Sequence, residues 1–300
     1  MTDTLSDTGH SLPPAAGSQR STRRRRQRVE RGILFGVILT GAVVIMIPLA
    51  WMIATSLKQP GAVYLYPPVW LPNPPQWGNY IEVLTVANFG RYFANSALVS
   101  GFTVLGSVLS CAMAGYSFSR LRSPGRNLIF LILLSTLMLP STVTIVPTFV
   151  VFQRLDWLNT FYPLIVPSFF GNAFYIFLLR QFFMTIPLDL EDAGRIDGAS
   201  SRQIFARIML PLATPALMTV AIFSFIGAWN DFFYPLIYLN SEDMYTVALG
   251  VANFQGSTRV GPQMQLLMAA SFMATVPVLI IFFLAQRFFI RGIVFTGIKG

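Results

Sequence analysis

Six long apolar runs constrain this sequence more than any other feature. They cover roughly residues 32–56, 93–117, 127–151, 163–184, 211–239 and 264–290. A helix rises about 1.5 Å per residue, so about 20 residues cross the roughly 30 Å hydrocarbon layer of a membrane. The chain is 54% hydrophobic and 11% charged, which excludes an ordinary soluble domain. The runs lack the short alternating pattern of a β-barrel. We therefore expect an all-α integral membrane protein with six transmembrane helices.

The arginine distribution predicts how these helices are oriented. Residues 1–31 form a polar, arginine-rich tail, which we interpret as a disordered cytoplasmic leader rather than an arm for nucleic acid. With the tail inside, all but four of the 21 Lys and Arg residues lie on the cytoplasmic side. The four outside are Lys58, Arg91, Arg154 and Arg259. This is the positive-inside pattern. We expect residues 32–300 to form one membrane domain in contact with lipid, with both termini in the cytoplasm.

The segment 187–211 is the longest polar interval in the second half of the chain. Pro187 suits the first position of a helix, and acids are favoured in the turns that follow it. Those acids are Asp189, Glu191 and Asp192. Gly198 can adopt the positive φ that commonly ends a helix. Ser200 and Gln203 have the spacing of a capping box that begins a second helix, which continues into the next apolar run. The expected structure is two short helices joined by a glycine turn at a membrane edge.

The spacing in this segment resembles the signature of binding-protein-dependent ABC importer permeases. That signature is Glu-Ala-Ala, three residues, Gly, nine residues and Ile-x-Leu-Pro. Here it reads Asp192-Ala193-Gly194, then Gly198, then Ile208-Met209-Leu210-Pro211. Asp keeps the charge of the usual Glu on a shorter arm, whereas Gly194 weakens the first helix by about 1 kcal/mol relative to Ala. Residues 67–80 and 227–232 resemble carbohydrate-uptake members. The alternative is a solvated amphipathic linker between two membrane helices.

The resemblance implies an ABC type I importer permease-like fold and a maltose-type sugar permease subunit in a bacterial or archaeal plasma membrane. It implies four kinds of neighbour: a second, related permease subunit, two ATPase subunits, an external solute-binding protein and lipid. The 187–211 loop would lie in a cleft of an ATPase, which would hold ATP and Mg, and this chain would carry no cofactor. The residues expected to form the contact are Glu191, Asp192, Ala193, Gly194, Gly198, Ala199, Ile208, Leu210 and Pro211.

Polar residues in the apolar runs are candidates for lining a translocation path. Asp231 is the only acid in any run, and acids inside a membrane tend to be functional. It follows Asn230, and Tyr234 would share a helical face with Asn230. An acid at a solvated helix end, or a structural pair with Asn230, explains Asp231 equally well. For the other candidates, a role in lining a cavity and a role in the packing of kinked helices are equally good explanations. These candidates are Ser141, Thr144, Asn172 and Tyr175.

A stripe of small residues recurs every fourth position in the second run: Thr103, Ser107, Cys111 and Gly115. Such a stripe lets another helix approach closely, so we expect packing there. The proline- and aromatic-rich segment 57–92 is expected to be extended and stiff. It is interpreted either as an interfacial belt or as a docking surface.

The sequence lacks motifs that would indicate other classes. No GxxxxGK[ST] stretch exists, so the chain is not expected to hydrolyse nucleotide itself. His10 is the only histidine, which argues against a histidine metal site or proton relay. The main alternative function is an ion-coupled secondary carrier, which would usually show internal repeats and a charged midplane pair. A membrane scaffold comes third. The solute, expected to be a sugar or an oligosaccharide, is not identified by these residues.

Overall fold

A computed structural model describes residues 16–67, 69–85, 88–256 and 263–294, and every regular element in these ranges is helical. The chain divides into two units, Met1–Met52 and Ile53–Gly300, with the division inside helix α1 (Ala16–Ser56). Helix α1 begins within the tail that we expected to be disordered, and residues 1–15 lie outside the described residues. Its part Glu30–Ser56 has the length and composition of a membrane span.

Four described helices are long and apolar enough to cross a membrane, namely Glu30–Ser56, Phe89–Arg120, Tyr162–Thr185 and Met264–Gln286. Two further spans are formed only if each of two bent pairs counts as one crossing. The first pair is Arg126–Met138 with Thr142–Arg154, and the second is Ser201–Leu212 with Thr214–Trp229. All six apolar runs of the sequence therefore have a helical counterpart, but two of them are not straight.

The third run is bent by 104°. It consists of α4 (Arg126–Ser135), the 3-10 helix η2 (Thr136–Met138) and α5 (Ser141–Arg154). Leu139 and Pro140 both have extended backbone at the break. Proline disfavours helical backbone in the residue before it and has no N–H to donate, so the helix stops there. The expected span over 127–151 therefore corresponds to two helices joined at a sharp bend rather than to one straight helix.

The fifth run is broken at both ends. The loop's second helix consists of α9 (Ser201–Ile204), the π-helix η4 (Phe205–Met209) and α10 (Leu210–Leu212). It meets α11 (Thr214–Trp229) at 77° instead of continuing into it, since Pro211 and Pro215 each lack an N–H. Helix α11 then ends at Trp229, and α12 (Phe233–Tyr238) is separate. The fifth run is therefore interrupted at residues 230–232.

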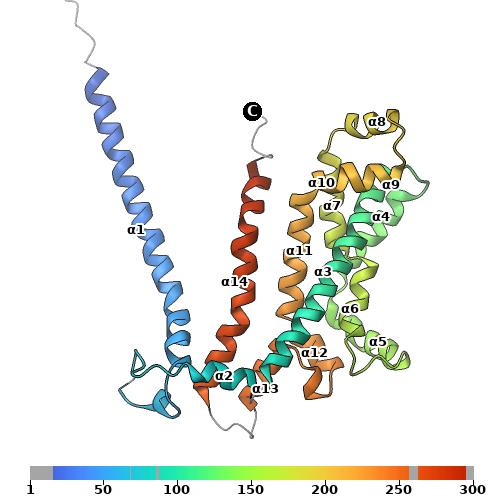
Figure 1. Ribbon diagram of the computed structural model, residues 1–300. Helices are drawn as coiled ribbons and strands as arrows, with labels where there is room; N and C mark the ends of the chain where they lie inside the picture. The colour runs from blue at the N-terminus through green and yellow to red at the C-terminus, as the bar shows by residue number, and fades with distance from the viewer. Residues whose placement is uncertain (1–15, 68, 86–87, 257–262, 295–300) are drawn as a thin grey trace, which may run out of the picture. The chain divides into compact units, whose positions relative to one another are not determined.

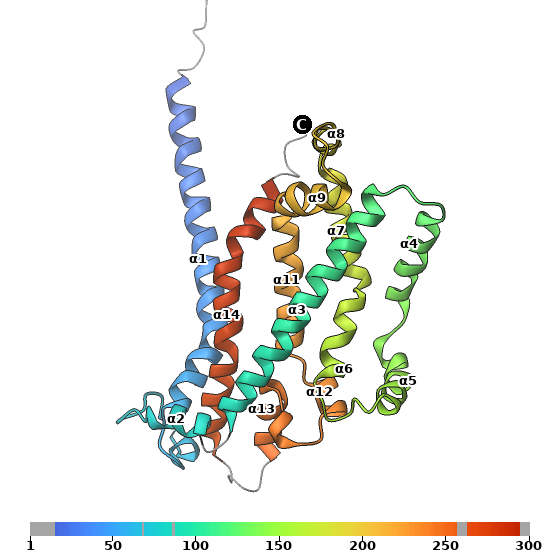
Figure 2. The same ribbon diagram turned by 45° about the vertical axis from the view of Figure 1, so that its right-hand side comes forward.

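Within the second unit, α3 (Phe89–Arg120) packs along α7 (Ala173–Thr185) and α11, as both views show (Figures 1 and 2). The 3-10 helix η3 (Val166–Phe170), which follows α6 (Tyr162–Ile165), completes the contact with α3. In the small-residue stripe, a Cβ on Gly115 would lie 3.0 Å from the Cβ of Leu179. Gly106 is not part of the predicted stripe, but a Cβ there would also be too close to a neighbour, at 2.4 Å from the Oγ of Ser168. The small-residue stripe therefore allows close packing, as predicted.

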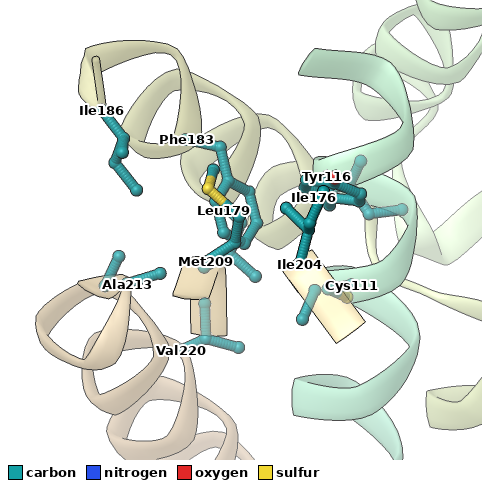
Figure 3. Packing of buried hydrophobic residues seen from close by; sticks show 12 residues of the cluster. Cys111, Tyr116, Ile176, Leu179, Phe183, Ile186, Ile204, Met209, Ala213 and Val220 are labelled. Atoms are coloured by element: carbon teal, nitrogen blue, oxygen red, sulfur yellow. The ribbon is translucent and has the colours of Figure 1, made fainter. Parts of the chain in front are cut away.

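The core beside the 187–211 loop joins these helices to the loop itself. Figure 3 shows Cys111 and Tyr116 of α3 facing Ile176, Leu179 and Phe183 of α7. The same cluster includes three residues from the second half of the loop and the start of α11, and these are Ile204, Met209 and Ala213. Because one continuous apolar cluster holds all of them, the loop is built onto the ends of α3 and α7.

A second apolar cluster lies at the opposite end of α3. It joins α2 (Gly78–Thr85), the start of α3, the end of α11, α13 (Val247–Gly256) and α14 (Met264–Val294). The segment 57–92 includes the start of α3, and its described residues before α2 are mostly irregular, as its prolines predict, apart from the short 3-10 helix η1 (Ala62–Tyr64). The 3-10 helix η5 (Glu242–Met244) lies in the loop between α12 and α13.

Candidate coupling site

The first helix of the loop, α8 (Asp189–Ile196), ends in a hydrogen-bonded glycine turn. Gly198 has a φ of 79°, and its N–H donates to Arg195 O at 3.0 Å. The N–H of Ala199 donates to Gly194 O at 2.9 Å. These two bonds define a Schellman motif, in which the left-handed residue is most often glycine. The predicted turn at Gly198 is confirmed, and it sets the direction in which the chain leaves α8.

The second helix begins with the predicted capping box. The side-chain oxygen of Gln203 accepts a hydrogen bond from Ser200 N at 2.8 Å, and Ser200 Oγ accepts one from Gln203 N at 3.4 Å. These bonds satisfy two N–H groups that have no partner inside the helix. Helices α8 and α9 are thus separated by only a few residues, each fixed by its own backbone hydrogen bonds.

Gly194 packs α8 against the second helix. A Cβ at this position would lie 2.9 Å from Ile208 Cδ1 and 3.4 Å from Ile204 Cγ1. The residue that departs from the usual alanine therefore lies where the two helices are in close contact. Glycine at position 194 lowers the helix propensity of α8 by about 1 kcal/mol. In return, its missing side chain lets α8 pack closely against the second helix, so the loop is not loosened.

Glu191 is the buried acid of this site. Its side chain is 1% exposed, and its Oε1 pairs with Nε of Arg120, 6% exposed, at 3.0 Å. The same guanidinium donates from Nη2 to Phe183 O at 2.6 Å and to Ile186 O. Arg120 is the last residue of α3, and Phe183 and Ile186 lie at the end of α7. In the sequence Arg120 is one of the expected cytoplasmic arginines, and nothing in its local pattern indicates this buried pair.

Asp192 has a partner within its own helix. Arg195 donates from Nη1 to Asp192 Oδ1 at 2.9 Å, and its Nη2 lies 3.4 Å from Glu191 Oε2. The side chains of Asp192 and Arg195 are 61% and 54% exposed, so solvent screens their attraction. The desolvated carboxylate of the loop is therefore Glu191, and Asp192 is the exposed one.

The predicted contact residues divide into two groups. Four are exposed and available to a partner, and these are Asp192, Ala193, Gly198 and Pro211. The other five are buried or half-buried within the chain, and these are Glu191, Gly194, Ala199, Ile208 and Leu210. The second group fixes the loop to the helices. Large apolar side chains that were not predicted lie exposed beside the first group: Leu188, Leu190 and Ile196, the last 86% exposed.

The candidates for a translocation path do not form one cluster among the described residues. Asp231 lies in the break after α11, where its Oδ1 accepts hydrogen bonds from Phe233 N at 3.0 Å and Tyr234 N at 3.2 Å. Asp231 thus begins α12. Asn230 and Tyr234 do not share a helical face, because the helix ends between them.

The other candidates lie elsewhere. Asn172 is the N-cap of α7, where its Oδ1 accepts from Phe174 N at 3.0 Å and from Tyr175 N at 3.2 Å. Tyr175 is half-buried against the core beside the loop. Ser141 begins α5, and Thr144 is exposed on the same helix. Asn230 lines a cavity of about 180 Å³ with residues of α11, α13 and α14, among them Trp229 and Ser271.

Within the described ranges, no three His, Cys, Asp or Glu side chains lie close enough to hold a metal ion together. The chemistry of the site is mechanical and electrostatic. A charged helix is anchored on one side by a buried ion pair and exposes acidic and apolar residues on the other.

Comparison with known proteins identifies the class. Residues 103–294 match the family described as binding-protein-dependent transport system inner membrane component, and the chain belongs to this family. It is the membrane permease component of an ABC importer, a transport component rather than an enzyme. The match includes the whole of the 187–211 loop.

Relatives and a solved structure cover most of the chain. The arabinooligosaccharides transport system permease protein AraQ of Halalkalibacterium halodurans is 35% identical over 248 residues, 82% of this chain and 86% of AraQ. The diacetylchitobiose uptake system permease protein NgcG of Streptomyces coelicolor is 34% identical over 256 residues, 85% of this chain and 84% of NgcG. A crystal structure of a bacterial ABC transporter involved in alginate import has a TM-score of 0.75 at 25% identity, covering 93% of this chain and 100% of that chain.

Proposed function

We propose that the 187–211 loop couples this permease to a separate ATPase subunit, with α8 as the element that enters the ATPase. The observation that carries the proposal is the two-sided construction of α8. Glu191 and Gly194 face the chain, whereas Asp192, Ala193 and Ile196 are exposed. An exposed apolar residue beside a charged one is typical of a surface that a protein partner covers. A passive linker would need neither the buried ion pair nor the two fixed helix ends.

The transported solute is proposed to be an oligosaccharide or another sugar. Two relatives that match over more than four fifths of the chain are permeases for arabinooligosaccharides and for diacetylchitobiose. The related transporter of known structure imports alginate, an acidic polysaccharide. The common feature of these solutes is a chain of sugar rings, and we extend it to this protein.

The assembly is proposed to contain a second, related permease subunit, two ATPase subunits that hold ATP and Mg, and an external solute-binding protein. Both termini and the 187–211 loop are proposed to lie in the cytoplasm, because most arginines lie on that side. Reporter fusions after Ser123 and Ser200 should show a cytoplasmic location, and a fusion after Asn73 should show an external one. An external signal at Ser200 would exclude contact between this loop and an ATPase.

Copurification tests the partner assignment. The permease is purified from its native membrane in mild detergent, and the bound proteins are examined for a P-loop ATPase. Uptake is then measured in vesicles with internal ATP or with an ion gradient alone. A bound ATPase together with ATP-dependent uptake supports the proposal, whereas uptake driven by the ion gradient alone refutes it.

The solute class is tested with the partner binding protein. Its thermal unfolding midpoint is measured with arabinotriose, diacetylchitobiose, maltotriose and glycerol 3-phosphate. A rise with one of the three sugars supports the proposed class, and a rise with glycerol 3-phosphate alone contradicts it.

A further inference from the structure

We propose that Arg120 is a positioning residue for coupling, which ties α8 to the ends of α3 and α7 so that the three move as one body. This inference rests on the proposed function of α8. Arg120 joins three helices, since it belongs to one of them and its guanidinium contacts the other two. It belongs to α3, its Nη2 donates to Phe183 O at 2.6 Å at the end of α7, and its Nε lies 3.0 Å from Glu191 Oε1 of α8.

Burial makes this connection selective. The two side chains are 6% and 1% exposed, so neither charge has water as an alternative partner. An ion removed from water must keep its counter-ion, since an uncompensated buried charge is far more costly than an exposed one. The carbonyl groups at the end of α7 carry partial negative charge, which favours a cation at this place, and Phe183 O accepts from both Ile186 N at 3.3 Å and Arg120 Nη2. Separating α8 from α3 would break the Arg120–Glu191 pair and leave Arg120 held only by the α7 carbonyls.

Arginine is the side chain that this geometry requires. Its planar fork carries several N–H donors, so Nη2 can donate to the α7 carbonyls while Nε lies beside Glu191 Oε1 as an ion-pair partner, without a hydrogen bond between those two atoms. Lysine offers one compact ammonium group on a flexible stem, and it would pair with the carboxylate without the same hold on Phe183 O. Replacement by lysine should therefore keep the charge balance while loosening the connection.

The connection extends to the exposed side of α8. Arg195 contacts both Glu191 Oε2 and Asp192 Oδ1, so four charges of alternating sign run from Arg120 to Asp192. The packing of α8 that Gly194 permits is against Ile204 and Ile208, in α9 and η4. The ion pair adds a link to α3, a different helix from those that Gly194 approaches. A force applied to exposed α8 would thus reach α3 and α7 through Arg120.

The experiment uses the complete transporter, with its ATPase and binding protein, reconstituted in lipid. The binding protein is loaded with the panel sugar that it retains. The measured quantity is the ratio of stimulated to basal ATP hydrolysis per assembled complex. The main variant is the double replacement Arg120→Gln with Glu191→Gln, which removes both buried charges and leaves none unpaired. Arg120→Lys is the conservative variant. Arg122→Gln is the control, since Arg122 is an exposed arginine in the loop that follows α3.

The double variant should assemble and show a stimulation ratio at least fivefold lower than the parent, with Arg120→Lys between the two and Arg122→Gln unchanged. A merely structural role would lower the yield or thermal stability of the complex and leave the ratio per complex unchanged, and that result would overturn the inference. If the double variant does not assemble, Arg120→Lys decides by the same ratio.

Gly198→Val is measured in the same assay, to separate a failure of this inference from a failure of the proposed function. Loss of stimulation in Gly198→Val with a normal ratio in the Arg120 variants refutes this inference alone. Normal ratios in all variants refute the proposed function as well.

Discussion

Replacing Gly198 by Val perturbs the coupling loop through a single backbone angle. The φ of Gly198 is 79°, and a Cβ placed on it meets no heavy atom within 4 Å. The cost of a side chain there is therefore conformational, not steric. Left-handed backbone costs an L-residue about 1–2 kcal/mol, and β-branched residues tolerate it least. A penalty of that size changes the ratio of the native turn to other turns by roughly 5- to 30-fold.

The structural consequence is confined to the direction of α8 relative to α9. If Val leaves the left-handed region, the bonds from Gly198 N to Arg195 O and from Ala199 N to Gly194 O are lost. Helices α8 and α9 can then change their relative direction. The site is exposed and lies outside the described membrane spans, so insertion and folding should proceed. Sugar-loaded binding protein should stimulate ATP hydrolysis far less in the reconstituted variant than in the parent, and uptake should fall with it.

Two other substitutions make this assay specific. Gly125→Val places the same residue at a φ of 76° with equally open surroundings, but in the loop between α3 and α4. Gly198→Asn introduces asparagine, which adopts left-handed backbone more readily than other residues with a side chain. Both should retain most of the stimulation. The reasoning is refuted if Gly198→Val behaves like the parent, or if Gly125→Val loses as much stimulation as Gly198→Val.

Three further predictions concern stability and the role of Asp231. Gly194→Ala should change the unfolding midpoint of the purified complex little. Alanine gains about 1 kcal/mol in helix propensity. This gain is opposed by the cost of moving Ile208, whose Cδ1 would lie only 2.9 Å from the new Cβ. Gly106→Ala should lower that midpoint by the equivalent of about 1–3 kcal/mol, since its Cβ would meet Ser168 Oγ at 2.4 Å, whereas Gly101→Ala, with nothing within 4 Å, should not. Asp231→Asn should preserve assembly and uptake because an amide oxygen can accept the same two N–H groups, and Asp231→Ala should destabilise by about 1 kcal/mol. Loss of uptake in a fully assembled Asp231→Asn complex would instead indicate that the charge itself acts in transport.

The features that sequence predicts well here depend on a few neighbouring residues. The turn at Gly198 and the capping box at Ser200 each follow from backbone preferences within a short stretch, and both are present. The long helices α3 and α14 follow from uninterrupted apolar composition. The breaks were harder to locate, because an apolar run shows that a segment is buried in lipid without showing that it is straight. Pro140 and Asp231 decide where the helices stop, one by lacking an N–H and the other by accepting two.

The two acids Asp231 and Glu191 show why the centre of the coupling site could not be found from sequence alone. Position in an apolar run indicates whether a residue lies in the membrane, and by that measure Asp231 was a candidate for a functional acid, with a solvated helix end or a structural pair with Asn230 as equally good explanations. Burial by protein depends instead on which distant segments meet. Glu191 lies in a polar loop, yet its side chain is 1% exposed and α3 supplies Arg120 as its counter-ion. Helical spacing alone places Glu191 and Gly194 on one side of α8 and Asp192 and Ile196 on others, but it does not say which side is covered. That choice is made by tertiary contact, and it turns a sequence motif of similar acids into one anchoring carboxylate and one exposed carboxylate.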